Sequence, residues 1–179
     1  MVTLYYNGIV LKVLGKKWYN SEMIIEVNNE QQTKDLAAKI GKLLKGGEVF
    51  ELIGDVGAGK TTFVKGLAVG LEIEDDIQSP SYTISWLYDA RNGLQLVHYD
   101  FYRLTEPGIM ANEVAEMIQD KNTITIIEWA DIVDGILPEQ RYTIRFESPS
   151  ENVRLITLPD TLGSALWFYC SILQHPNAV

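Results

Sequence analysis

The chain has 179 residues, of which 46% are hydrophobic, and a formal net charge of −9. These values are typical of one α/β domain with a sizeable core, and the acidic charge argues against direct binding of DNA or RNA, which requires clustered Lys and Arg. A single cysteine, Cys170, excludes an internal disulfide framework and a zinc site built on cysteines, and it suits a reducing cytoplasm. We therefore expect a cytoplasmic protein that meets nucleic acid only through partners.

Residues 1–22 form an N-terminal extension whose role the sequence does not reveal. Lysines interrupt its apolar residues and no small-residue cleavage site follows, so we expect no secretory signal. A fresh pattern begins at Met23, with a short strand, a capping Asn29 and a helix that ends at Gly46-Gly47. The apolar residues of this helix recur at helical spacing, at Leu36, Ile40, Leu43 and Leu44. Within the helix, Thr33 is expected to be solvated.

The stretch 54–62, GDVGAGKTT, matches the phosphate-loop pattern G-x-x-x-x-G-K-[ST] at every fixed position. The apolar run 49–53 precedes it and a helix-like segment follows, as the motif requires. Glycines let the backbone turn and bring N–H groups to anionic oxygens, and the first turn of the helix faces them with its positive end. Lys60 would place its charge on the β- and γ-phosphates of a nucleotide, and the Thr61 hydroxyl is placed to bind Mg²⁺. An unrelated glycine-rich turn would match this pattern in roughly one chain of this length in a hundred.

The segment 79–83, SPSYT, follows an acidic stretch and leads into the next strand. Pro80 interrupts regular structure there, and the neighbouring hydroxyls could meet a γ-phosphate or its metal, as switch loops do in nucleotide hydrolases. A polar turn without function is the alternative. Beyond it, Arg91-Asn92-Gly93 predicts a hairpin turn between strands at 84–88 and 94–99.

Two acidic residues stand at the ends of predicted strands. Asp100 closes the second strand of the hairpin on the same face as His98, at the edge where open α/β sheets place ligands. Glu128 ends the β-branched run 123–127, which is the general form of a Walker B element. Either carboxylate could hold Mg²⁺ directly or through water, although Asp100 taken alone is more often a cap or a solvated charge. His98 is expected in the core or behind the site, and Trp129 either stacks on a base or caps the core.

The C-terminal part contains three further elements. Residues 105–119 predict a helix or an irregular helical turn, and 141–147 with 152–158 predict a terminal antiparallel pair. The tail 159–179 includes LGSALWFYCSIL, roughly half the length needed to cross a bilayer. We expect it to be a docking helix and not a membrane anchor.

Four motifs follow one another in a fixed order: the phosphate loop, SPSYT at 79–83, HYDFYRL at 98–104 and EWAD at 128–131. This order resembles one family closely, the TsaE proteins (YjeE-type ATPases) of bacterial tRNA threonylcarbamoyladenosine biosynthesis. The resemblance covers about residues 23–158, which would form the ATPase domain. It implies an α/β fold, a P-loop NTPase-like three-layer sandwich with a mostly parallel central sheet and antiparallel additions.

The resemblance also implies site residues and partners. ATP or ADP would be held by Asp55 and by the loop residues Gly57, Ala58, Gly59, Lys60, Thr61 and Thr62, with Thr33 and Trp129 near the adenine. Mg²⁺ would be bound by Thr61, Asp100 and Glu128, and catalysis would rest on Lys60, Asp100 and Glu128. Ser81 and Thr83 would belong to a switch-like loop. In this family the protein acts with TsaB and TsaD during N6-threonylcarbamoylation of adenosine 37 in tRNA, so that contact with tRNA is indirect and ATP hydrolysis drives or resets the assembly.

Two other functions use the same loop. A small-molecule or nucleoside kinase would use Asp100 as the base toward an acceptor hydroxyl and Arg103 as a clamp, but the five arginines are scattered and no arginine-rich lid is visible. A nucleotide-sensing module would hydrolyse little ATP. A GTPase is disfavoured because no N-K-x-D segment follows the loop. Since no arginine can be assigned to the γ-phosphate from the sequence, we expect slow turnover that partners stimulate.

Overall fold

A nine-stranded mixed sheet organises the chain in this computed structural model, which describes residues 2–6, 9–13 and 22–166. Across the sheet the strands follow the order β1 (Val2–Tyr6), β2 (Ile9–Val13), β3 (Met23–Val27), β9 (Arg154–Leu158), β8 (Tyr142–Glu147), β4 (Val49–Ile53), β7 (Thr123–Glu128), β6 (Gln95–Asp100) and β5 (Ser85–Asp89). The four central strands β8, β4, β7 and β6 are parallel, and all pairings outside them are antiparallel. The sheet therefore has the parallel centre and antiparallel additions that the sequence predicts.

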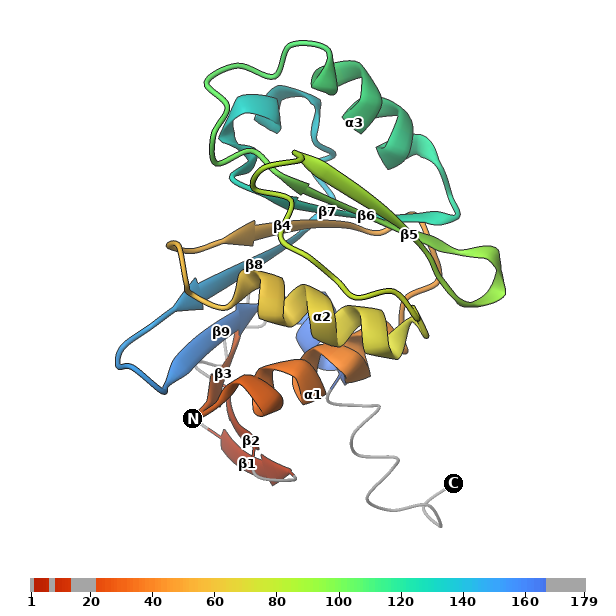
Figure 1. Cartoon of the computed structure of the whole chain (residues 1–179). Helices are drawn as coiled ribbons and strands as arrows, with labels where there is room; N and C mark the ends of the chain where they lie inside the picture. Colours follow the sequence, from red (N-terminus) through yellow and green to blue (C-terminus); the bar gives the residue numbers. More distant parts are fainter. Residues whose placement is uncertain (1, 7–8, 14–21, 167–179) are drawn as a thin grey trace.

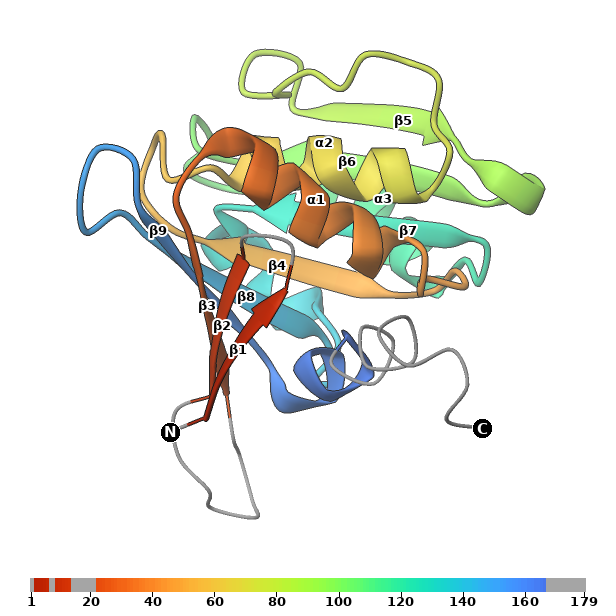
Figure 2. The ribbon, with the colours of Figure 1, turned by 90° about the horizontal axis from the view of Figure 1, so that it is seen from below.

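Helices cover both faces of the sheet (Figures 1 and 2). On one face lie α1 (Glu30–Gly41) and α2 (Lys60–Gly70), and on the other lie α3 (Met110–Gln119) and the 3-10 helix η2 (Ala130–Ile136). A second 3-10 turn, η1 (Arg91–Gly93), joins β5 to β6 at the predicted hairpin. These layers form the three-layer α/β sandwich expected of the fold class.

The alternation of side chains along the central strands decides which face each residue takes. Ile124 and Ile126 of β7 pack in the core beneath α1 and α2, whereas Ile127 packs in the smaller core beneath α3. With a period of two, Glu128 then lies on the α2 side of the sheet. In β6, Leu96 likewise packs toward α2, so Asp100 lies on that side as well.

Helices α1 and α2 approach each other more closely than their predicted patterns indicate. A Cβ on Gly66 would lie 2.6 Å from the Cβ of Ala37, and one on Gly70 would lie 2.8 Å from the Cα of Gly41. Thr33 of α1 is only 3% exposed, so the expectation that Thr33 is solvated is wrong. The sequence could not show this because α1 and α2 are separated by the whole of β4 and its loop.

Helix α1 also ends earlier than predicted, at Gly41 instead of near Gly46-Gly47. The guanidinium of Arg91 donates to the carbonyls of Gly41, Lys42 and Leu44 and, at the end of α2, to that of Gly70. A cation at two helix C-termini satisfies carbonyls that lack helical partners. Arg91 therefore ties both helices to the hairpin beyond β5.

On the opposite face, Tyr99 of β6 anchors α3. Its hydroxyl donates to Glu113 Oε1 at 2.9 Å. Burial and the neighbouring Glu113 carboxylate both raise the pKa of Tyr99, so the phenol stays protonated and remains a donor.

The two terminal segments contribute to this framework where the structure describes them. The extension 1–22 supplies β1 and β2, which continue the sheet beyond β3. In the predicted docking tail, residues 160–166 are helical, and Leu162 and Leu166 pack in the core beneath α1 and α2. Residues 167–179 of that tail lie outside the described residues. No helix in the described ranges is long and apolar enough to cross a membrane.

Candidate functional site

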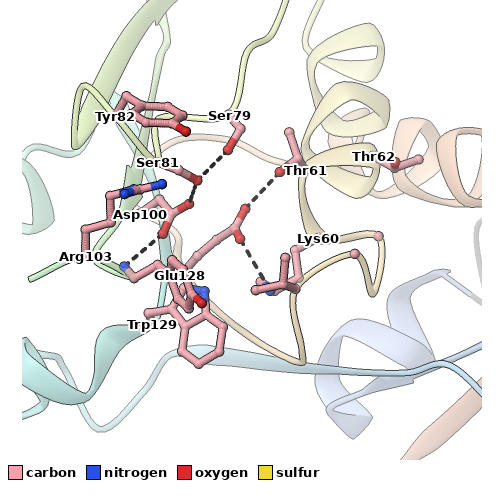
Figure 3. A pocket seen from close by; sticks show the side chains of 14 residues that line it. Lys60, Thr61, Thr62, Ser79, Ser81, Tyr82, Asp100, Arg103, Glu128 and Trp129 are labelled. Carbon is pink, nitrogen blue, oxygen red and sulfur yellow. Dashed lines mark hydrogen bonds and ion pairs between the residues drawn. The ribbon is translucent and has the colours of Figure 1, made fainter.

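The phosphate loop and two strand ends surround one cavity at the carboxyl edge of the parallel strands. Strand β4 ends at Ile53, the loop follows, and α2 begins at Lys60. In the pairing of β6 with β7, Asp100 stands opposite Glu128, so both carboxylates reach this edge on the α2 side. The cavity has a volume of about 400 Å³. It is lined by Val56, Gly57, Gly59, Lys60, Thr61, Thr62, Ser79, Ser81, Tyr82, Asp100, Tyr102, Arg103, Glu128 and Trp129 (Figure 3).

Two glycines keep the loop open toward this cavity. Gly57 has φ +79° and Gly59 has φ +103°, conformations that residues with a Cβ rarely adopt. A Cβ on either glycine would meet no protein atom within 4 Å and would project into open space. Between them, Ala58 is buried and donates its N–H to the carbonyl of Asp55 at 3.1 Å. This backbone leaves room for an anion beside the N-terminus of α2.

Lys60 lies at the floor of the cavity and is 5% exposed. Its ammonium donates to the carbonyls of Gly54 at 2.7 Å and Asp55 at 3.0 Å, and it lies 3.6 Å from Glu128 Oε2. The Thr61 hydroxyl donates to the other oxygen of Glu128, Oε1, at 3.3 Å. The lysine and the hydroxyl that the motif predicts are therefore both within reach of one buried carboxylate (Figure 3).

His98 stands behind Glu128 and is inaccessible to solvent. Its Nε2 lies 3.0 Å from Glu128 Oε1. Because a carboxylate only accepts hydrogen bonds, Nε2 carries the proton in this contact. His98 thus lies in the interior behind the site, as the sequence predicts, and its contact is with Glu128.

Asp100 is joined to the segment 79–83 by hydrogen bonds. Its Oδ2 accepts from the Ser81 hydroxyl, which lies 2.8 Å from Ser79 Oγ, and its Oδ1 accepts from the Tyr102 N–H at 3.0 Å. Asp100 therefore faces the cavity and also caps the turn that follows β6. Of the two hydroxyls assigned to the switch-like loop, Ser81 lines the cavity, whereas Thr83 is exposed and does not line it.

The backbone of this segment holds one strained residue. Ile84 has φ +71°, which is unfavourable for a β-branched side chain, and its N–H bonds to the carbonyl of Pro80 at 2.6 Å. Such a conformation persists only where surrounding contacts fix it, and it is typical of functional loops. Here the contact between Ser81 and Asp100 helps to fix it.

Aromatic rings and one arginine form the outer wall. The Trp129 ring lies 5.1 Å from the Lys60 ammonium and 4.9 Å from the Tyr102 ring, and part of it packs against the core beneath α3. Across the cavity, the Arg103 guanidinium lies over the Tyr82 ring with its carbon 4.4 Å from the centroid. The sequence predicted Arg103 at this site only for the kinase alternative, where it would act as a clamp beside Asp100, and it did not predict the contact of Arg103 with Tyr82.

Thr33 and Trp129 do not share a cavity. Thr33 borders a second hollow of about 300 Å³ on the other side of the loop. Gly57, Gly59 and Thr62 line both hollows, and the second one is completed by Asn29, Glu30, Glu151, Asn152 and Arg154. Sequence reasoning did not assign these five residues to a site, because they come from the start of α1 and its cap, the loop before β9 and the first residue of β9, and meet only in the fold. Asp55 is exposed and lines neither of these two hollows, but it lines two others along the loop.

A magnesium ion would find few protein ligands here. No group of three or more His, Cys, Asp or Glu side chains suited to a metal occurs in the described part of the chain. The donors available are the Thr61 hydroxyl and the carboxylates of Asp100 and Glu128. Such a set suits Mg²⁺, which keeps several waters and takes one or two carboxylates together with phosphate oxygens.

Comparisons with known proteins agree on one family. The sequence model of the family described as "Threonylcarbamoyl adenosine biosynthesis protein TsaE" matches residues 27–156. The chain is 38% identical over 128 residues to the tRNA threonylcarbamoyladenosine biosynthesis protein TsaE of Treponema pallidum, covering 72% of this chain and 93% of the relative. It is 34% identical over 154 residues to the protein of the same name from Bacillus subtilis, covering 83% and 92%. The crystal structure of Bacillus subtilis YdiB superposes with a TM-score of 0.65 at 30% identity, covering 88% of this chain and 98% of that one. The chain therefore belongs to the TsaE family.

Proposed function

We propose that this protein binds ATP with Mg²⁺ and hydrolyses it slowly, in support of the threonylcarbamoyl modification of adenosine 37 in tRNA. The observation that carries the proposal is the meeting of Lys60, Thr61, Asp100 and Glu128 around one cavity beside an open phosphate loop. The names of the relatives, which place them in threonylcarbamoyladenosine biosynthesis, supply the biological process.

The loop residues would bind the phosphates and hold them in place. Free N–H groups at the start of α2 and the open faces of Gly57 and Gly59 accommodate anionic oxygens. The Lys60 ammonium now bonds to two loop carbonyls, and phosphate oxygens would take their place as stronger, charged acceptors. The γ-phosphate would then face the two carboxylates.

Glu128 and Asp100 would arrange the groups that react. Mg²⁺, when bound with the nucleotide, would neutralise phosphate charge and polarise the bond to be broken. Thr61 would offer it a hydroxyl oxygen, while Glu128, which Lys60 and His98 hold in place, would orient a ligand water or the attacking water. Asp100 would respond to the segment 79–83 through Ser81.

We place the base in the hollow beside Thr33. The ring of Trp129 lies next to Lys60, at the end of the site where the β- and γ-phosphates would lie, and the base is at the opposite end of a nucleotide. The Thr33 hollow shares Gly57, Gly59 and Thr62 with the phosphate cavity and so continues from it. Trp129 would then sense the phosphates more than the base, which revises the adenine contact first expected for it.

Partners of the TsaB–TsaD type would complete the function. The net charge of −9 gives this chain no electrostatic basis for binding tRNA by itself, so contact with tRNA would be indirect. ATP hydrolysis would then act on the assembly and not on the modified base.

Equilibrium binding tests the site directly. Titration calorimetry with Mg-ATP should give saturable binding to the wild type and roughly 10- to 150-fold weaker binding to Lys60→Ala, as expected for loss of a charged contact with phosphate worth about 1.5–3 kcal/mol. Lys65→Ala is the matched control, since Lys65 is also on α2 but does not line the cavity. Binding of ATP by Lys60→Ala as tight as by the wild type would refute the assignment of the site.

A further inference from the structure

We propose that Arg103 binds the terminal phosphate of the nucleotide and that Tyr82 positions it for this contact. The inference rests on the proposed function, because it concerns the same cavity. Two cations line that cavity, Lys60 and Arg103, and two carboxylates, Asp100 and Glu128. Only one of the cations already has strong polar partners.

Lys60 is engaged by two carbonyls and lies 3.6 Å from a carboxylate oxygen of Glu128. In contrast, within residues 22–166 no carboxylate or carbonyl accepts a hydrogen bond from the Arg103 guanidinium. Asp100, three residues earlier, is not free to pair with it in this arrangement, because its two oxygens accept from Ser81 and Tyr102. Arg103 therefore brings an unpaired positive charge to a site built for an anion.

The other arginines with polar contacts differ in this respect. Arg91 donates to four carbonyls, Arg141 pairs with Glu51 and Asp134, and Arg154 donates to three carbonyls of its own loop. These side chains stabilise the fold. The exposed Arg103, which lines the cavity, has no such structural task among the described contacts.

The contact with Tyr82 positions Arg103 without using the hydrogen-bond donors of its guanidinium. Its guanidinium carbon lies 4.4 Å from the ring centroid, and because this contact is with the π-system of the ring, it leaves the five N–H donors available for hydrogen bonds to an anion. That arrangement suits bidentate binding of phosphate oxygens. Tyr82 itself is 84% exposed, so its ring is not held by the core and is open to the guanidinium of Arg103.

The position of Arg103 selects the terminal phosphate. The α- and β-phosphates would be enclosed by the loop and by the first turn of α2. Arg103 follows β6 and lies with Tyr82 on the far side of Asp100 and Glu128 from Lys60 and Thr61 (Figure 3). A guanidinium in that place would contact the γ-phosphate, which ATP has and ADP lacks. Arg103 would thereby let the protein distinguish the two nucleotides, and Tyr82 would link that distinction to the exposed segment 79–83.

The test compares a triphosphate with a diphosphate. Calorimetric titrations with Mg-AMP-PNP, which resists hydrolysis, and with Mg-ADP are made on the wild type, Arg103→Ala and Arg103→Lys. Arg103→Ala should weaken AMP-PNP binding about 10- to 100-fold, as for loss of a charge-assisted hydrogen bond, and leave ADP binding within about twofold. Arg103→Lys should fall between, since it keeps the charge but loses the planar fork. Arg145→Ala is the matched control, because it removes an exposed arginine of β8 that does not line the cavity.

The role of Tyr82 is tested by a conservative pair. Tyr82→Ala should lose part of the preference for AMP-PNP over ADP, and Tyr82→Phe, which keeps the ring, should restore it. If Arg103→Ala binds AMP-PNP as the wild type does, or loses AMP-PNP and ADP to the same extent, the inference is overturned while the proposed function stands. If the wild type binds neither nucleotide, the proposed function fails and the inference fails with it.

Discussion

The open face of Gly57 yields the sharpest prediction for the loop. Substitution by Ala would place a Cβ at φ +79°, which costs roughly 1–2 kcal/mol because a left-handed conformation brings the Cβ close to the backbone. No protein atom lies within 4 Å of that Cβ, so no clash adds to this cost. For a domain of this size the change should lower the midpoint of thermal unfolding by about 2–8 °C and leave the protein folded.

The same methyl group would occupy the space where phosphate oxygens approach the loop. Loss of one backbone N–H contact to a charged oxygen is worth about 1.5–3 kcal/mol, which corresponds to a roughly 10- to 150-fold weaker affinity for Mg-ATP. Calorimetric titration at 25 °C, where both proteins remain folded, measures this change.

Gly93 supplies a matched control for Gly57→Ala. It has φ +73°, and its Cβ would also meet no atom within 4 Å, but it lies in the exposed turn between β5 and β6, away from the loop. Gly93→Ala should therefore lose a similar amount of stability and bind Mg-ATP as the wild type does. Equal losses of affinity in the two variants, or unchanged affinity in Gly57→Ala, would refute the reasoning.

Three further predictions concern the framework and the wall of the site. Arg91→Ala should lower the free energy of unfolding by about 2–3 kcal/mol, since it removes charged hydrogen bonds at two helix ends, whereas Arg145→Ala should change it by no more than about 0.5 kcal/mol; equal effects in urea titrations would contradict the role of Arg91 at these helix ends. The fluorescence of Trp129, identified as the part of the signal that is lost in Trp129→Phe, should change more on adding ATP than on adding ADP, and to the same extent with ATP and GTP. A change that differs between ATP and GTP would instead place the base beside Trp129. Hydrogen bonds from the Asn122 N–H and the Thr123 hydroxyl lower the pKa of Asp120, so this carboxylate stabilises the fold at neutral pH and loses that effect as the pH falls through its lowered pKa. Asp120→Asn should accordingly be less stable than the wild type at pH 7 and equally stable at pH 2; a difference that persists at pH 2 would contradict this.

The parts of the site that the sequence predicted are those with local causes. Lys60 and Thr61 follow from a contiguous motif, and the positions of Asp100 and Glu128 follow from strand periodicity and the rule that ligands bind at the carboxyl ends of parallel strands. Asp100 and Glu128 stand opposite each other because of the register in which β6 pairs with β7, and the sequence alone does not reveal that register.

The parts that were missed depend on contacts between distant segments. Thr33 is buried and borders the same hollow as Gly57, Gly59 and Thr62, which follow it in the chain by more than twenty residues, and nothing near Thr33 in the sequence indicates this proximity. The early end of α1 depends on Arg91, whose guanidinium reaches carbonyls 47 to 50 residues away in the chain. Arg103 was visible as a residue near Asp100, but its free donors and its contact with Tyr82 appear only once the segment 79–83 has folded against β6.

Release of phosphate from Mg-ATP, measured for the chain alone and with a purified TsaB–TsaD-type complex in the absence of any small-molecule acceptor, tests the central claim most directly. The proposed function predicts slow release that rises sharply with the partners and is abolished by Lys60→Ala. No stimulation by the partners, together with ATP consumption that requires an added nucleoside or metabolite, would contradict it and identify a kinase.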